Sequence, residues 1–210
     1  MVISTLEAEP AEAATLFGDR IDVAREFTRH LALQGEALGL IGPLELPRLW
    51  SRHILNCAIV APLLRPGLVG DVGSGAGLPG LVLAIARPDV SFVLIEPMER
   101  RVAWLTSQVT ALGLANATVV RARAEDVRLP TQLDQVTARA VSAFKSLIPL
   151  TAPLLRPGGE LVVMKGAGAA GEITNAAKAI QRYRLRNVEV LTLGEGVLQD
   201  VTRVIRATVE

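Results

Sequence analysis

Cysteine is almost absent from this chain, because Cys57 is the only one among 210 residues. A single cysteine excludes a disulfide within the chain and a zinc site built from several thiolates. We therefore expect no metal centre, and such sparse cysteine fits a reducing, cytoplasmic location. We interpret Cys57 as a small buried apolar side chain, because cysteine packs as a hydrophobe when it has no chemical task.

Long apolar runs and an excess of charge of one sign are missing as well. No apolar run reaches the roughly 18 residues that a helix needs to cross a bilayer. The first residues, MVISTLEAEPAEAA, are acidic where a secretory signal is basic. We expect no membrane partner. The 22 basic and 21 acidic residues leave a formal net charge of +1, which does not by itself indicate a nucleic-acid binder.

The residues that are present suffice for a sizeable core, since 50% are apolar, and the length fits one medium domain with a small extension. The cations are 19 arginines against three lysines, and several arginines lie early in the chain: Arg20, Arg25, Arg29, Arg48 and Arg52. Arginine makes bidentate phosphate contacts and stacks on bases. Two interpretations stay open: a patch that faces RNA, or solvated helix faces in an arginine-rich composition.

The most informative segment is Leu68 to Gly80, LVGDVGSGAGLPG, in which an apolar run ends in Asp71 and passes at once into a glycine-rich loop. Glycine has no Cβ, so such a loop adopts positive φ and lets a ligand approach the main chain. If Leu81 to Ala86 begins a helix, its free N–H groups face the same space. The segment predicts a cofactor-binding loop, although its glycine spacing also fits the dinucleotide pattern G-x-G-x-x-G.

Acidic residues help to choose between cofactors. Asp71 would repel a pyrophosphate but attract the ammonium group of S-adenosylmethionine, which has no phosphate. Glu96 closes the run SFVLIE about one crossover later and can accept both hydroxyls of an adenosine ribose in either cofactor. Ala124 and Glu125 follow the run ATVVRA, where methyltransferases commonly hold adenine. We predict S-adenosylmethionine, bound by Asp71, Glu96 and the loop around Gly75; a nicotinamide or flavin cofactor is the alternative.

Seven short runs rich in valine and isoleucine follow one another from Leu68 onward: residues 68–72, 91–96, 117–122, 135–141, 160–165, 188–193 and 201–209. Helical patterns between the first five runs, clearest in Arg100 to Leu112, predict a mostly parallel sheet covered on both faces. The last two runs are joined by LGEGVLQD, which is too short for a crossover helix. We predict an α/β fold: a seven-stranded, mostly parallel, Rossmann-like methyltransferase sheet with an antiparallel last strand and an N-terminal helical extension.

The extension is predicted to contain two helices. The residues from Asp19 to Gln34 place apolar side chains at three- and four-residue steps, with the first residue as the N-cap. Pro47 suits the first turn of a second helix, which carries Arg52 and His53. We therefore divide the chain into a helical extension, residues 1–66, and a methyltransferase domain, residues 67–210.

The position after the fourth run bears on the methyl acceptor. Methylation of an exocyclic amine typically uses an Asn/Asp-Pro-Pro-Tyr/Phe loop there, whereas residues 138–141 are ARAV. A pyrimidine carbon needs a covalent thiolate, and Cys57 lies far away in sequence. A ring nitrogen with a free lone pair, such as guanine N7, needs neither device because it has no proton to lose. The residues favour such a nitrogen.

Four side chains are candidates for the acceptor side. Arg139 ends the fourth run and could clamp the methionine carboxylate or an RNA phosphate, or belong to a surface ion pair. Lys165 ends the fifth run and is either a phosphate contact or a solvated lysine. Arg52 and His53 would meet the site if the second helix packs over the carboxyl edge of the sheet. His53 would orient the substrate, contact RNA or lie on a plain helix surface; it and Arg139 are the candidate catalytic residues.

Together these motifs resemble the 16S rRNA (guanine-N7) methyltransferase G family, historically called glucose-inhibited division protein B. The resemblance extends from about Arg25 to Val209 and is most specific in DVGSGAGLPG, in LIE followed by RRVAWL, in ARA, in KG and in the Arg52-His53 pair. It implies methylation of guanine N7 in the 16S rRNA of the small subunit. It also implies contacts to S-adenosylmethionine at Gly73, Leu78, Ala124, Glu125 and Arg139.

The chain departs from the family pattern within the extension. Asn56-Cys57 stands where Asp-Ser is common, and Gly39-Leu40-Ile41 stands where Asn-Leu-Thr is common. These differences concern RNA docking more than cofactor binding. The implied partner is 16S rRNA or the small ribosomal subunit, with no stable protein partner. Two other classes stay open: a nicotinamide-dependent oxidoreductase, and a non-catalytic RNA-binding or assembly module of the same fold.

Overall fold

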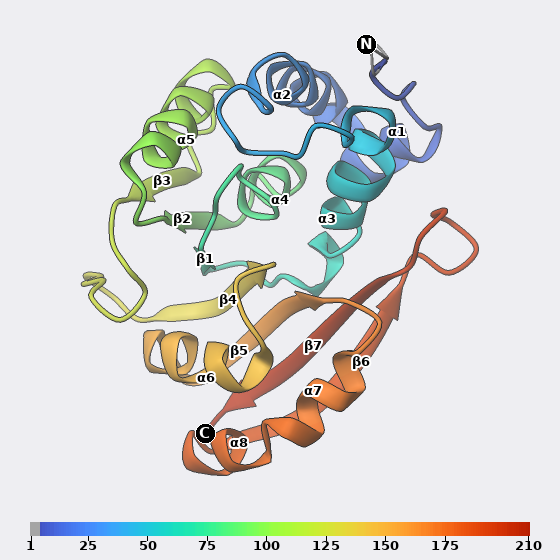
Figure 1. Cartoon of the computed structure of the whole chain (residues 1–210). Helices are drawn as coiled ribbons and strands as arrows, with labels where there is room; N and C mark the ends of the chain where they lie inside the picture. Colours follow the sequence, from blue (N-terminus) through green and yellow to red (C-terminus); the bar gives the residue numbers. More distant parts are fainter. Residues whose placement is uncertain (1–4) are drawn as a thin grey trace.

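The computed structural model describes residues 5–210, which form a seven-stranded sheet with helices on both faces (Figure 1). In space the strands follow the order β3-β2-β1-β4-β5-β7-β6. Their bounds are β1 Leu68–Val72, β2 Ser91–Ile95, β3 Ala117–Val120, β4 Leu133–Arg139, β5 Leu155–Lys165, β6 Leu185–Leu193 and β7 Thr202–Val209. The strand order reverses between β1 and β4, and ligands bind at such a switch point beyond the carboxyl ends of the strands.

Strand directions confirm the predicted sheet. β1 pairs in parallel with β2 and β4, β2 with β3, and β4 with β5. β7 lies between β5 and β6 and is antiparallel to both. The connection from β6 to β7, residues 194–201, is too short for a crossover helix, so the chain must reverse direction there.

Two layers of helices bury the sheet (Figure 1). On one face lie α2 (Ile21–Gln34), α4 (Gly80–Ala86) and α5 (Glu99–Ala111); on the other lie α6 (Phe144–Thr151), α7 (Ala169–Asn175) and α8 (Ala177–Arg182). Each face has its own hydrophobic cluster. Because both faces are covered, central strands such as β1 are buried along nearly their whole length and have continuous apolar sequences.

The N-terminal extension packs directly against the sheet layer. Phe27 and Leu31 of α2 are fully buried and belong to the same cluster as Leu81 of α4. A short helix, α1 (Glu12–Phe17), adds Phe17 to that cluster. The extension therefore shares its core with the rest of the chain, and the boundary at residue 66 remains a prediction about folding units.

The helices of the extension differ from the predicted ones in two ways. Asp19 is not an N-cap: it lies in a 3-10 turn, Gly18–Arg20, and α2 begins after Arg20 without a side-chain cap. The second helix is not one α-helix. It consists of a 3-10 turn (Leu46–Arg48), a π-helical segment (Leu49–Leu55) and α3 (Asn56–Ala58). Apolar spacing does not distinguish these windings, because their hydrogen bonds differ in span by only one residue each way.

Helices were predicted between all of the first five strands, and this is wrong between β3 and β4, where residues 121–132 form no helix. The segment RARAEDVRLPTQ offers no apolar stripe that a helix could bury. In contrast, α7 and α8 lie between β5 and β6, where small residues give only a weak apolar stripe.

No helix in the described part of the chain is long and apolar enough to cross a membrane. Residues 5–210 also contain no group of three or more metal-ligating side chains arranged to hold an ion.

Candidate active site

The glycine loop connects the carboxyl end of β1 to α4, at the switch point of the sheet. Gly73, Gly75 and Gly77 have φ of 73°, 55° and 92°, which residues with a Cβ rarely adopt. A Cβ on Gly80 would collide with the Asp71 carboxylate, so the start of α4 also requires glycine. The helix begins at Gly80, one residue before the predicted start at Leu81. The loop is thus shaped by its glycines, and Gly73 and Gly75 are partly exposed within it.

Asp71 is fully buried near the end of β1. Its Oδ2 accepts a hydrogen bond from the Gly80 N–H at 3.1 Å, whereas its Oδ1 has no partner within residues 5–210. Burial raises the pKa of Asp71 to about 7, and the Glu96 carboxylate acts in the same direction. A nearby cation stabilises such a carboxylate, and the ammonium group of S-adenosylmethionine is one. The residue therefore fits the predicted cofactor.

Glu96 follows β2 and is buried beside the loop. Its Oε2 accepts from the Gly75 N–H at 2.9 Å, and its Oε1 accepts from the Met98 N–H at 3.0 Å. Arg101 lies 4.0 Å from Oε1. These contacts fix the loop relative to β2. Each carboxylate oxygen has a further acceptor position, so the predicted ribose contact is compatible with the observed hydrogen bonds.

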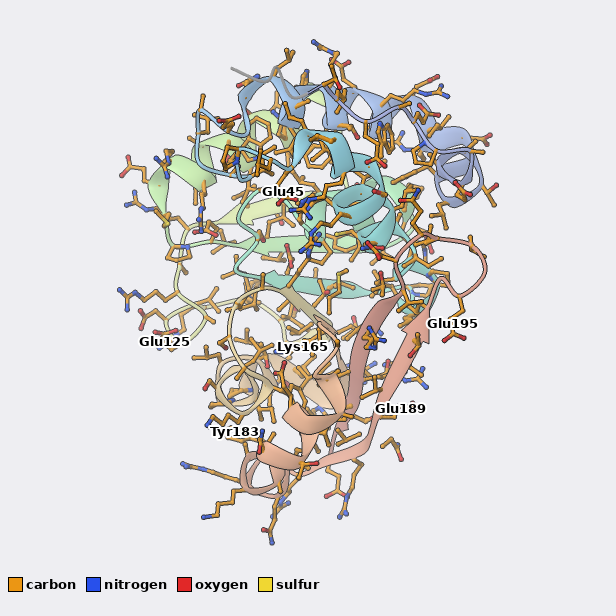
Figure 2. All side chains as sticks on the ribbon, turned by 45° about the vertical axis from the view of Figure 1, so that its right-hand side comes forward. Glu45, Glu125, Lys165, Tyr183, Glu189 and Glu195 are labelled. Carbon is orange, nitrogen blue, oxygen red and sulfur yellow. The ribbon has the colours of Figure 1, made fainter. Side chains whose placement is uncertain are left out.

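The remaining predicted cofactor residues lie along the same carboxyl edge. Leu78 is half-buried, packs on the hydrophobic cluster and precedes a cis peptide bond to Pro79. Ala124 is half-buried after β3, and the neighbouring Glu125 is exposed, 4.0 Å from Arg123. Figure 2 shows Glu125 on the loop after β3. Contacts to the cofactor at these three positions stay predictions.

Arg139 ends β4 and reaches across to the extension. Its Nη2 donates to His53 Nδ1 at 2.9 Å and to the Arg52 carbonyl at 3.3 Å. Its Nη1 lies 3.4 Å from the His53 carbonyl oxygen and 3.2 Å from Cys57 Sγ. The π-helical segment that carries Arg52 and His53 therefore packs over the carboxyl edge of the sheet. Arg139 is bound to this segment and does not form a surface ion pair.

Cys57 agrees with its interpretation as a buried apolar side chain. It is fully buried, and burial raises the pKa of its thiol, although Arg139 opposes this. A protonated thiol in this position is not a nucleophile.

His53 is held between a carboxylate and a guanidinium. Its Nε2 lies 2.6 Å from Glu45 Oε2, and its Nδ1 faces Arg139. A guanidinium only donates, so Nδ1 is the acceptor and the ring proton sits on Nε2, which donates to Glu45. Burial lowers the pKa of His53, Glu45 opposes this, and Arg139 and Arg52 lower it further. His53 is therefore a neutral imidazole at pH 7 and not a plain surface histidine.

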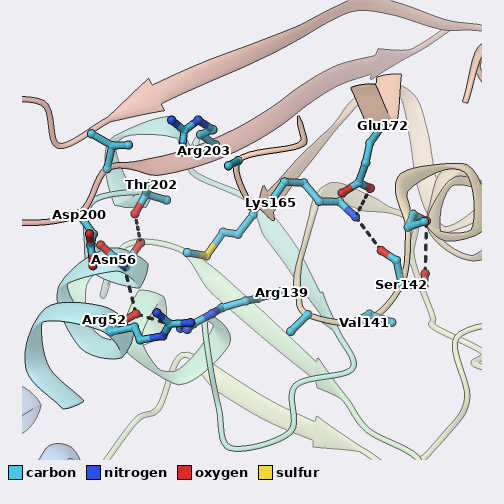
Figure 3. Close-up of a pocket in the computed structure, with 16 residues that line it drawn as sticks. Arg52, Asn56, Arg139, Val141, Ser142, Lys165, Glu172, Asp200, Thr202 and Arg203 are labelled. Atoms are coloured by element: carbon cyan, nitrogen blue, oxygen red, sulfur yellow. Dashed lines mark hydrogen bonds and ion pairs between the residues drawn. The ribbon is translucent and has the colours of Figure 1, made fainter. Parts of the chain in front are cut away.

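A cavity of about 790 Å³ opens beyond the carboxyl ends of β4 and β5 and the start of β7 (Figure 3). Its lining includes four of the chain's cationic side chains: Arg52, Arg139, Lys165 and Arg203. Val141 lines the cavity too, and its Cγ2 would lie 2.8 Å from a Cβ placed on Gly73. The cavity therefore adjoins the glycine loop, as an acceptor site next to a cofactor site must.

Lys165 is a buried side chain that joins two segments at the cavity wall. Its side chain is only 8% exposed, and its Nζ donates to the Ser142 carbonyl at 2.6 Å and to Glu172 at 2.9 Å (Figure 3). Glu172 in turn accepts from the Phe144 N–H at the start of α6, at 2.6 Å. The pair fixes the loop after β4, so Lys165 is not a solvated lysine.

Three of the early arginines, Arg25, Arg29 and Arg52, have different surroundings. Arg25 bridges Glu9 and Asp22, and Arg29 pairs with Glu26, so these two belong to solvated helix faces. Arg52 instead faces the cavity.

Glu45 and Glu172 were not identified from the sequence. Glu172 meets Phe144 across 28 positions, and Glu45 precedes an irregular helix, so neither has a periodic pattern or a motif around it. One usable signal was the position of Glu45 ahead of the Arg52-His53 pair, since a histidine with a fixed tautomer needs a partner.

Solved structures share this fold. Cofactor-bound Rv0187 from MTB matches with a TM-score of 0.62 at 18% identity, over 93% of each chain. M. jannaschii TYW2 in complex with AdoMet matches with a TM-score of 0.58 at 19% identity, over 76% of each chain. The strand order, the glycine loop and the acids at the carboxyl ends of β1 and β2 define the class: this is the Rossmann-like fold of S-adenosylmethionine-dependent methyltransferases.

Sequence comparison identifies the family. The model of the GidB family, described as rRNA small subunit methyltransferase G, matches residues 20–201. The ribosomal RNA small subunit methyltransferase G of Leifsonia xyli subsp. xyli is 74% identical over 205 residues, 98% of each chain. That of Clavibacter michiganensis subsp. michiganensis is 69% identical over 204 residues, 97% of each chain. The chain belongs to the rRNA small subunit methyltransferase G family, as its motifs predicted.

Proposed function

We propose that this chain transfers a methyl group from S-adenosylmethionine to N7 of a guanine in the 16S rRNA of the small ribosomal subunit. The observation that carries the proposal is the family match over residues 20–201, within which the loop contacts of Asp71 and Glu96 are intact. A dinucleotide enzyme would present its pyrophosphate to this loop, and the buried Asp71 carboxylate opposes that. A ribosomal substrate implies a cytoplasmic reaction.

Residues at the glycine loop would hold the cofactor. When bound, S-adenosylmethionine supplies a methyl group already activated by its sulfonium. Asp71 would bind the ammonium group through its unused oxygen, and Glu96 would accept the ribose hydroxyls. The loop at Gly73, Gly75 and Leu78 would lie against the cofactor, and Ala124 and Glu125 would hold the adenine. Their contribution is placement, because orientation of the reacting atoms can supply a large part of a rate enhancement.

The cavity beside the loop would receive the target guanine. N7 has a lone pair and no proton, so the residues need not include a general base, and His53 as a neutral ring fixed by two partners has an orienting role. Arg52 and Arg203 provide positive charge for the flanking phosphates. Arg139, at the border between cavity and loop, would contact the cofactor or a phosphate. The Glu172 carboxylate would face the positive charge that the methylated base acquires.

Transfer of labelled methyl from S-adenosylmethionine to small subunits from a strain that lacks this gene tests the proposal. Wild-type protein should label the 16S rRNA, and Asp71→Asn should lose most of the label, with Asp89→Asn, an exposed surface change, as the control. Binding of the cofactor without any labelling would show that the acceptor is wrong. Failure of the wild type to bind the cofactor would refute the assignment of the loop.

A further inference from the structure

Glu45 is surrounded by three basic side chains just before the π-helical segment. Its Oε1 accepts from Arg48 at 2.6 Å, and its Oε2 accepts from His53 Nε2 at 2.6 Å, with Arg52 Nε 3.8 Å away. The side chain is only 17% exposed. Although burial acts in the opposite direction, hydrogen bonds from His53 and Arg48 hold the pKa of Glu45 below its usual range. Glu45 is therefore ionised at neutral pH.

A chain of two hydrogen bonds leads from Glu45 to the cavity. Glu45 fixes the Nε2–H tautomer of His53, which leaves Nδ1 free to accept from Arg139 at 2.9 Å. Arg139 and Arg52 both line the cavity, whereas Glu45 does not. With an Nδ1–H ring, two donors would face each other and Arg139 would lose this contact. The hydrogen bond that turns Arg139 Nη2 toward the His53 ring thus depends on a carboxylate outside the cavity.

We propose that Glu45 is a positioning residue for methyl transfer: it acts through His53 on Arg139, and directly on Arg52, to aim both guanidinium groups into the acceptor cavity. The inference rests on the proposed function, because it assigns a task to the cavity of that reaction. The charged and titratable groups around His53 are Glu45, Arg52 and Arg139; Arg48 faces Glu45, and Cys57 faces Arg139.

The chain contains a matched control for this arrangement. Glu26 pairs with Arg29 at 2.6 Å and with His30 Nε2 at 2.9 Å, which repeats the Glu–Arg–His chemistry on α2. Neither His30 nor Glu26 lines the cavity. Glu26→Gln therefore removes the same kind of charge and contacts without touching Arg139.

Kinetics with small subunits separate positioning from stability. For Glu45→Gln we expect kcat/KM to fall about tenfold, with most of the change in KM for the subunit, because the guanidinium groups contact the substrate before and during the reaction. Glu26→Gln should stay within twofold of the wild type. Equal values for both variants, measured on protein shown to be folded by its near-UV circular dichroism, would overturn the proposal.

The ring of His53 gives a readout that needs no substrate. The chain has two histidines, so His30→Gln leaves His53 as the only imidazole for nitrogen NMR. We expect a protonated Nε2 and an unprotonated Nδ1 in that variant, and a lower pKa of His53 once Glu45→Gln is added. An Nδ1–H tautomer in His30→Gln would overturn the proposal even if Glu45→Gln failed to fold, and an unchanged pKa of His53 in the folded double variant would overturn it as well. If only the proposed function is wrong, His30→Gln and the double variant will show the predicted NMR behaviour, and the wild type will methylate no substrate.

Discussion

At the scale of single residues, Asp71 is suited to bind a ligand and contributes little to the stability of the fold. One of its oxygens has one hydrogen bond and the other has none within residues 5–210. An unsatisfied buried polar atom typically costs about 1–3 kcal/mol. A group in this state is relieved when a cation binds, which is typical of functional sites.

The raised pKa of Asp71 predicts a pH dependence of stability. Between its usual value of 3.8 and about 7, the folded protein keeps a proton that the unfolded chain has released. The free energy of unfolding should therefore fall as pH rises through this window. Relative to Asp71→Asn, the wild type should lose on the order of 2 kcal/mol between pH 5 and pH 7. Urea unfolding of both proteins at both pH values measures this. A difference in the free energy of unfolding between wild type and Asp71→Asn that is the same at pH 5 and pH 7 would contradict it.

Cofactor affinity should depend on the same carboxylate with the opposite sign. A bound cation favours ionised Asp71, so binding should release protons near pH 6.5 and the affinity for S-adenosylmethionine should rise between pH 6 and pH 8. Asp71→Asn should weaken binding at pH 8 by at least about tenfold and remove the pH dependence. Isothermal titration calorimetry in buffers of different ionisation enthalpy measures both effects. A wild-type affinity that is flat with pH would be incompatible with a cation at Asp71.

The sequence predicted individual site residues where one local segment contained the signal. Asp71 and Glu96 stand at strand ends next to recognisable runs, and the structure brings them together through Gly75 and Gly80. The contact between His53 and Arg139 spans 86 positions, and no local pattern reports a partner so distant. The tautomer of His53 could be assigned only once the positions of Glu45 and Arg139 were known.

At the scale of elements, strands were easier to predict than helices. Burial on both faces imposes a continuous apolar run, which β1 and β2 show plainly. Helical spacing was ambiguous, because the π-helical segment Leu49–Leu55 has the apolar pattern of an α-helix. Polar connections such as residues 121–132 gave no positive signal of either kind.

The start of α4 should be intolerant of any side chain. A Cβ on Gly80 would meet the Asp71 carboxylate and Leu94, both in the sheet, so Gly80→Ala should destabilise the protein by roughly 2–3 kcal/mol. Gly171 in α7 has nothing within 4 Å of its Cβ position, and Gly171→Ala should be neutral or stabilising by up to about 1 kcal/mol. Thermal unfolding of both variants checks this. Similar melting temperatures for the two would show that the packing at Gly80 is looser than described.

At the scale of the whole molecule, charge is nearly balanced. The formal net charge is +1, and several arginines are neutralised by neighbouring acids. Long-range attraction to RNA supplies little affinity to such a protein. Recognition must then depend on the few cations at the cavity and on complementary shape. A folded particle offers a better-defined shape than a flexible RNA.

This balance predicts a preference for assembled substrate. Small subunits should be methylated at least several-fold faster than protein-free 16S rRNA at the same concentration, because folded RNA or ribosomal protein supplies part of the contact surface. Initial rates with both substrates at physiological salt measure this. Equal rates would show that the protein-free RNA contains every feature that the protein recognises, and would contradict this prediction.

The central claim is that the methyl group is transferred to N7 of a guanine in 16S rRNA. Small subunits from a strain without this gene should be incubated with the protein and with S-adenosylmethionine that carries a deuterated methyl group, and the 16S rRNA then digested to nucleosides for mass analysis. The account predicts one labelled nucleoside, 7-methylguanosine, which disappears with Asp71→Asn. A labelled base methylated at any other atom, or no labelled nucleoside from protein that binds the cofactor, would contradict it.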